Sequence, residues 1–113
     1  MANKDDATTI NDLKKMLIKF RDDRDWKKFH TPKNLVQAIS IEANELMEEF
    51  LWKSDAEIEL LLKDKDFRQR IRFELADIMA FCLSFCDAAK IDLSQAVTEK
   101  MAHNKKKYPV EKS

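Results

Sequence analysis

Two pairs of acidic residues share the same spacing, and each pair lies in a long segment with helical periodicity. Glu42 and Glu45 form the first pair, and Glu74 and Asp77 form the second. An α-helix advances about 100° per residue, so residues three apart lie on one face. Carboxylate oxygens are the ligands that Mg²⁺ prefers. If the two pairs met, they would form an all-carboxylate site for Mg²⁺, which Mn²⁺ could replace.

The first segment places its acids beside an apolar face. With Leu35 at 0°, that face lies between about 20° and about 160°. Glu42, Glu49 and Glu45 fall at about 340°, about 320° and about 280°, so they share one strip. Glu48 falls at about 220°, apart from the other three. Helical geometry therefore divides the four glutamates into two groups.

The later segment repeats this placement. With Phe67 at 0°, Glu74 and Asp77 fall at about 340° and about 280°, again beside a broad apolar face. The acid pairs converge if these faces pack on each other or on those of a second subunit. Clustered carboxylates raise one another's pKa unless cations neutralise them. One such pair is usually a solvated helix edge, and a matched second pair raises the probability of a metal site without making it the commoner reading. A di-iron bundle would need Glu-x-x-His on two helices, and the sequence has none.

Capping signals help to divide the whole chain into five helices, two of which are the acid-bearing segments. Thr or Ser side chains followed by an acid, and Thr followed by Pro, mark helix starts. The predicted helices run from Thr9 to residues 23–25, from Thr31 to about Lys53, over a short segment after Ser54, from about Asp66 to about Lys90, and from Asp92 to Tyr108.

The composition supports an all-α fold. The 113 residues include no Gly and two Pro, and 37% are charged, so few tight turns are available. We expect a bundle of four main helices plus a short helix, in a single domain over residues 1–113. Residues 1–7 are expected to fray, and residues 110–113 to form a tail.

Several functional classes are disfavoured. Lys+Arg and Asp+Glu both number 21, so the chain lacks the basic excess of a non-specific nucleic-acid binder. It has no apolar run long enough for a membrane span and no signal peptide. Cys82 and Cys86 are expected to be free, buried thiols in a reducing cytoplasm. The two histidines lack the spacing for a zinc site with them.

The segments around the acids resemble the MazG-type nucleotide pyrophosphohydrolases, and most closely the dCTP-pyrophosphatase-like and integron-associated branch. The resemblance runs in order from about Phe20 to Pro109. The acidic motif alone is weakly specific, whereas "RDWKKFHTPKNL", "FLWKS" and "NKKKYP" together are more so. The segments are "FRDDRDWKKFHTPKNLVQAI", "ELMEEFLWKS", "ELADIMAF" and "KMAHNKKKYP".

The resemblance implies a cytoplasmic all-α enzyme that hydrolyses nucleoside triphosphates to monophosphate and pyrophosphate, either to remove aberrant nucleotides or to control dNTP pools. It implies homodimers or dimers of dimers (homotetramers), with active sites between subunits. It makes Glu42, Glu45, Glu74 and Asp77 the Mg²⁺ ligands. The implied substrate-binding residues are Trp26 and Trp52 at the base, and Lys100, Asn104 and Tyr108 at the phosphates or the pocket edge.

Other assignments stay open. Glu49 either orients the attacking water or is a solvated neighbour of Glu45. Glu48 lies either on the surface or behind the ligands. His30 is either structural or a phosphate or base contact, and Phe81 is core or pocket wall. A Trp more often serves the core or an interface than a base platform, and Trp52, beside the acidic strip, is the better placed of the two for base stacking.

The sequence departs from the family pattern at three positions. Ile41 precedes Glu42 where many members have a tandem acid. Phe81 and Leu17 stand where the dCTP-preferring branch carries Tyr and His, which weakens any inference of strict cytosine specificity. A non-catalytic helical module that dimerises through the same apolar faces is the competing class. Stepwise release of inorganic phosphate is the competing reaction.

Overall fold

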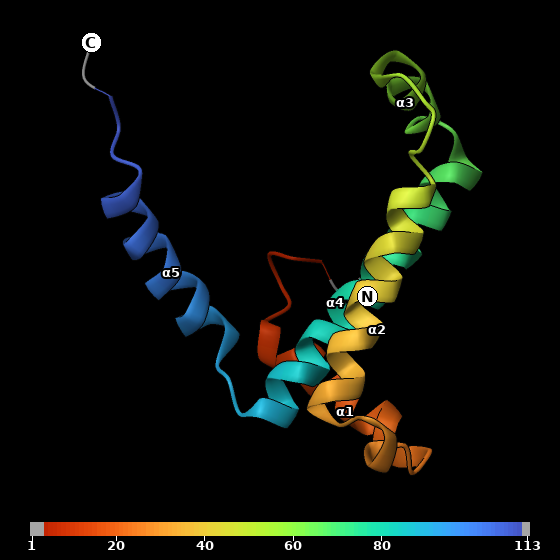
Figure 1. Ribbon diagram of the computed structural model, residues 1–113. Helices are drawn as coiled ribbons and strands as arrows, with labels where there is room; N and C mark the ends of the chain where they lie inside the picture. Colours follow the sequence, from red (N-terminus) through yellow and green to blue (C-terminus); the bar gives the residue numbers. More distant parts are fainter. Residues whose placement is uncertain (1–3, 112–113) are drawn as a thin grey trace.

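The computed structural model describes residues 4–111, and every regular element in that range is helical. Part of the predicted frayed N-terminus (residues 1–3) and of the tail (residues 112–113) lies outside the described residues. The predicted all-α fold is confirmed. The elements are α1 (Ile10–Asp23), the 3₁₀ helix η1 (Lys27–Phe29), α2 (Pro32–Glu48), α3 (Asp55–Leu61), α4 (Lys65–Ala89) and α5 (Leu93–Lys107) (Figure 1).

Side-chain caps set the helix starts. Thr9 and Asp12 form a reciprocal capping box with two hydrogen bonds of 3.0 Å. Ser54 and Glu57 form a second box at the start of α3. Each cap satisfies backbone N–H groups that the first helical turn leaves unpaired. The other helices are capped by the side chains of Thr31, Asp64 and Asp92.

The end of α2 differs from the prediction. The helix ends at Glu48 rather than near Lys53. The next residues form turns, and Trp52 has a φ of 62°, which a right-handed helix cannot contain. Phe50 meets the ring of Phe67 edge-on, with centroids 5.7 Å apart. Contact with the start of α4 therefore competes with continuation of the helix.

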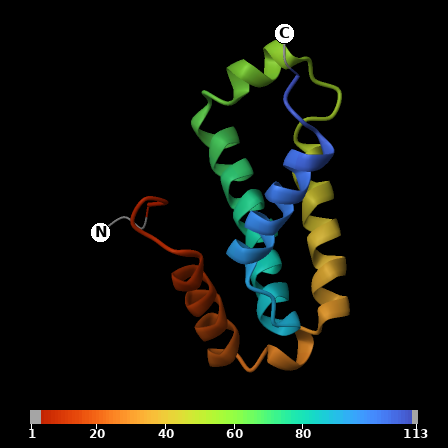
Figure 2. The same ribbon diagram turned by 90° about the vertical axis from the view of Figure 1, so that its left-hand side faces the viewer.

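The packing centres on α4. α2 runs along α4 in the opposite direction, joined to it through α3, and α1 packs against α4 as well (Figure 2). The buried apolar side chains among residues 4–111 are Leu35, Phe67, Leu83 and Cys86. Cys82 is half-buried, and both cysteines are free, as predicted. α5 stands away from the α2–α4 pair (Figure 1).

Many large apolar side chains remain exposed in the single chain. On α2 and α4, Val36, Met47, Leu75 and Met79 belong to the faces that the periodicity assigned to packing, whereas Ile41 and Phe73 lie outside these faces, at about 240°. None of the helices in residues 4–111 is long and apolar enough to cross a membrane. The exposed apolar residues of these two helices are Val36, Ile41, Met47, Phe73, Leu75 and Met79.

Candidate active site

The packing of α2 on α4 brings the two acid pairs close enough for their charges to interact. Burial raises the pKa of Glu42 above its ordinary value, and the adjacent Glu45 carboxyl raises it further through a hydrogen bond and through its charge. The charges of Asp77 and Glu74 act in the same direction. The other three predicted ligands thus all influence the Glu42 carboxyl group, as closely placed like charges do.

Glu74 also lies within the electrostatic influence of the glutamates near the end of α2. Burial raises the pKa of Glu74, the charges of Glu49 and Glu45 raise it further, and the Arg70 guanidinium opposes them. The Oε2 atom of Glu74 is buried and makes no hydrogen bond within residues 4–111. A buried carboxylate oxygen without a donor is costly, and a cation would satisfy it.

Glu49 and Glu48 differ in their surroundings. An ion pair holds Glu49 toward α4, with its Oε2 3.5 Å from Nε of Arg70. Glu48 is exposed, and its charge is the smallest of the named influences on Glu74. The structure thus places Glu49 nearer to the acid pairs than Glu48.

The donor set fits a hard divalent cation. As they stand, no three His, Cys, Asp or Glu side chains in the described part of the chain are arranged to hold a metal ion. Carboxylates of like charge repel one another, and their flexible side chains can gather around a cation. All donors are oxygens, the pKa of two carboxyl groups is raised, and one buried oxygen lacks a donor. These properties suit Mg²⁺.

A cavity of about 360 Å³ adjoins the acids, between α1, the η1 segment and α4. Asp77 lines it, together with the predicted substrate residues Trp26, His30 and Phe81. Trp26 also meets Phe20 edge-on, with centroids 5.7 Å apart. Aromatic walls suit a flat ring, and a carboxylate next to them can accept hydrogen bonds from polar groups of that ring.

Two polar residues of this cavity were not predicted from the sequence, Arg21 and Ser84. Arg21 is 7% exposed, and it donates from Nε to Asp22 at 2.9 Å and from Nη1 to Asp87 at 3.0 Å. Arg21 follows Leu17 by one helical turn, so it lies on the apolar stripe of α1. A charged residue on an otherwise apolar helix face needs a partner when it is buried. The position of Arg21 on this stripe was therefore the sequence signal that could have identified it.

The surroundings of His30 favour its neutral form. Burial lowers its pKa below the ordinary value of 6.5, and the positive charge of Arg21 lowers it further. The Nδ1 atom is buried and has no hydrogen-bond partner among the described residues. His30 therefore adds a neutral imidazole to the cavity wall.

Four predicted substrate residues lie apart from the acids in the single chain. Trp52 is 98% exposed in the turn region after α2. Lys100 and Asn104 lie on α5, and Tyr108 follows its last turn. Because α5 stands away from α2 and α4, these side chains do not join the cavity within one chain (Figure 1).

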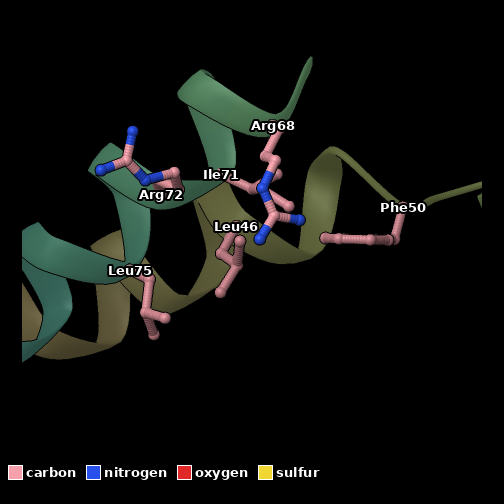
Figure 3. Close-up of a pocket in the computed structure, with 6 residues that line it drawn as sticks. All are labelled: Leu46, Phe50, Arg68, Ile71, Arg72 and Leu75. Atoms are coloured by element: carbon pink, nitrogen blue, oxygen red, sulfur yellow. The ribbon is translucent and has the colours of Figure 1, made fainter. Parts of the chain in front are cut away.

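A second cavity, of about 320 Å³, lies between α2 and α4 (Figure 3). It contains no carboxylate, and its two guanidinium groups border apolar side chains. We assign this surface to packing rather than to chemistry. The residues that line it are Leu46, Phe50, Arg68, Ile71, Arg72 and Leu75.

Known proteins resemble this chain in sequence and in fold. It is 36% identical over 102 residues to dCTP pyrophosphatase 1 of Rattus norvegicus, covering 90% of this chain and 60% of that protein. The human dCTP pyrophosphatase 1 is 34% identical over 101 residues, covering 89% of this chain and 59% of that protein. The chain thus spans about 60% of the length of these curated relatives.

A crystal structure of a pyrophosphatase from Archaeoglobus fulgidus DSM 4304 superposes with a TM-score of 0.83 and 41% identity. The match covers 89% of this chain and 93% of that one. The sequence profile of the MazG-like family matches residues 37–113, which include both acid pairs. The resemblance of the motifs is confirmed, and the chain belongs to the MazG-like family.

Proposed function

We propose that the chain is a Mg²⁺-dependent nucleoside triphosphate pyrophosphohydrolase that converts (d)NTP and water to (d)NMP and pyrophosphate. The substrates are dNTPs such as dCTP, or related and modified nucleotides. One observation carries the proposal: four mutually influencing carboxylates, including the unpaired Glu74 Oε2, adjoin an aromatic cavity. Membership in the MazG-like family and the relatives named dCTP pyrophosphatase 1 support it.

Glu42, Glu45, Glu74 and Asp77 are the proposed metal ligands. When bound, Mg²⁺ neutralises carboxylate and phosphate charge and acts as a Lewis acid toward the phosphoryl oxygens. With a cation bound, the four side chains would place the phosphate end of the substrate beside the cavity, because Asp77 belongs to both the acid cluster and the cavity wall. Without cation binding, their repulsion would also oppose binding of a triphosphate.

Glu49 is the proposed residue that orients the attacking water. Arg70 holds its carboxylate toward α4, where its charge reaches Glu74. The water oxygen forms a bond to the α-phosphorus in line with the bridging oxygen, and the bond from phosphorus to that oxygen breaks. Pyrophosphate leaves, and the Glu49 carboxylate accepts the proton of the water.

The base occupies the cavity. Trp26 and Phe81 supply aromatic surface, and His30 supplies a polar contact. Trp52, Lys100, Asn104 and Tyr108 complete the site for the base and the phosphates. Because a single chain keeps these four apart from the acids, we propose that a second subunit delivers them.

The active form in this proposal is a homodimer or a dimer of dimers. The apolar side chains left exposed on α2 and α4, and the separation of α5, support it. A cytoplasmic location is part of the same proposal, and the free cysteines support it.

The assay incubates the protein with each dNTP and Mg²⁺ and resolves the products. We expect monophosphate and pyrophosphate in equal amounts, and no product after chelation. Glu45→Gln should lower kcat/KM by at least about 100-fold, because it removes a ligand. Glu59→Gln, an exposed change on α3, is the matched control and should leave the rate unchanged.

Other outcomes would support the competing classes. Diphosphate as the first product would indicate stepwise phosphate release. If no nucleotide turns over, and neither Mg²⁺ nor any dNTP changes the thermal stability, a non-catalytic dimerising module is the better description.

A further inference from the structure

The cavity beside the acids has a charged group that the proposed reaction does not use. The Arg21 guanidinium carries five N–H donors and accepts nothing. Its bonds to Asp22 and Asp87 use Nε and Nη1. Nη2 makes no hydrogen bond within residues 4–111. The buried side-chain N and O atoms without a partner in this range are Thr8 Oγ1, His30 Nδ1 and Glu74 Oε2. Because Nη2 has no partner and is not among these buried atoms, solvent reaches it.

The guanidinium lines the cavity together with His30, and the charge of Arg21 is close enough to lower the pKa of His30. Leu17, one helical turn before Arg21 on α1, and Phe81 of α4 add apolar lining. Ser84 and a neutral His30 can each donate or accept, whereas Arg21 can only donate.

The ion pairs hold this donor in place. Asp22 follows Arg21 on α1, and Asp87 reaches it from α4. A side chain fixed by two carboxylates loses little further freedom when it binds a ligand. The guanidinium is thus a pre-positioned donor beside aromatic surface.

We propose that Arg21 is a specificity-determining residue that selects bases with a carbonyl oxygen on the edge that enters the cavity. This inference rests on the proposed function of the same site. Uracil, thymine, cytosine and guanine each carry such an oxygen, and adenine does not. A base in the cavity would exclude water from Nη2, and a donor that is then left without an acceptor discriminates strongly. dATP should therefore be the poorest of the natural substrates.

The test compares dTTP with its difluorotoluene isostere, which keeps the shape of thymine but replaces the carbonyl groups. Three proteins are measured: wild type, Asp87→Asn and the double variant Arg21→Met with Asp87→Asn. The double variant avoids leaving Asp87 as an unpaired, half-buried charge. Asp87→Asn removes the negative charge of the partner, but its amide oxygen can still accept the hydrogen bond from Nη1 of Arg21, so it is the matched structural control.

In wild type and in Asp87→Asn, kcat/KM should favour dTTP over the isostere by about ten- to hundred-fold. In the double variant, the ratio should fall to near one. The same ratio in all three proteins would overturn the assignment, and so would its loss in Asp87→Asn alone.

A metal-free binding measurement separates this inference from the proposed reaction. Titration calorimetry without metal measures the affinity of the same three proteins for thymidine monophosphate and for the monophosphate of the isostere. If no triphosphate is hydrolysed but the binding preference disappears only in the double variant, Arg21 reads the base and the proposed reaction is wrong. If hydrolysis occurs but the binding preference ignores Arg21, the reaction stands and this inference is wrong.

Discussion

At the scale of residues, the candidate site keeps negative charge close together at a cost in stability. Burial and neighbouring carboxylates raise the pKa values of Glu42 and Glu74, so the ionised forms are disfavoured in the fold. An acid whose folded-state pKa is raised destabilises the protein above that pKa, and the penalty disappears as the pH falls through it. Binding of a divalent cation would remove the same penalty.

Glu42→Gln should raise the melting temperature of the metal-free protein at pH 7 to 8. The amide removes one charge and can donate to the Glu45 carboxylate. Because Glu42 is partly exposed, we expect a rise of about 4 °C or less. The difference from wild type should shrink as the pH falls, because wild-type Glu42 then becomes protonated itself.

Calorimetry with and without Mg²⁺ measures this effect. Mg²⁺ should stabilise wild type and the Glu59→Gln control, but not Glu42→Gln. A lower melting temperature for metal-free Glu42→Gln would show that the glutamate stabilises the fold, contrary to this account.

At the scale of elements, the position of α4 determines where Glu74 and Asp77 lie. The Asp64 side chain fixes the start of α4, accepting a hydrogen bond of 2.9 Å from the backbone N–H of Phe67. Phe67 is itself in the core and contacts Phe50 after the end of α2. This cap therefore supports the register between the two acid-bearing helices.

Asp64→Ala should destabilise the protein by about 1 kcal/mol, because the N–H of Phe67 loses its acceptor. That loss corresponds to a fall of about 4–8 °C in melting temperature for a domain of this size. Lys63→Ala changes the preceding exposed residue and should have little effect. Equal stability of Asp64→Ala and wild type would contradict the role of the cap.

Local signals were sufficient to predict the helix starts and the placement of the acids. Thr9, Ser54 and Asp92 cap helices because their side chains bond backbone groups three residues ahead, which sequence spacing reveals. The shared position of Glu42 and Glu45 on one strip follows from the helical repeat alone. The family motifs then indicated that Glu42 and Glu45 of this strip are metal ligands.

Long-range contacts explain what the sequence did not reveal. The end of α2 depends on Phe50 meeting Phe67, which is distant in the chain. The pairing of Arg21 with Asp87 joins residues 66 positions apart. Neither contact has a local spacing rule, so the helix end was placed too late and the charged cavity residue was missed.

At the scale of the whole molecule, the single chain leaves much apolar surface uncovered. The core contains few fully buried side chains, and the cavity in Figure 3 opens between α2 and α4. α5 stands away from the α2–α4 pair (Figure 1), and its Val97 and Met101 are exposed in the single chain. A second copy of the chain would cover such surfaces, which supports the proposed dimer.

Leu75→Arg should convert the oligomer to a monomer. Leu75 is 53% exposed and lines the cavity in Figure 3 beside Arg68 and Arg72, so a third guanidinium would add repulsion and a desolvation cost. Light scattering after size exclusion measures the mass. Val110→Arg, an exposed change near the C-terminus, should leave it unchanged.

The monomeric variant should also lose hydrolysis, because the second subunit supplies Trp52 and the α5 residues in this account. A wild-type monomer that hydrolyses nucleotides, or a fully active monomeric variant, would contradict it.

The most direct test of the central claim is hydrolysis of a dNTP in ¹⁸O-labelled water with Mg²⁺, followed by mass spectrometry of both products. Attack at the α-phosphorus predicts one ¹⁸O atom in the monophosphate and none in the pyrophosphate, with all turnover lost in Glu45→Gln. Label in pyrophosphate or inorganic phosphate, or undiminished turnover in Glu45→Gln, would contradict the account.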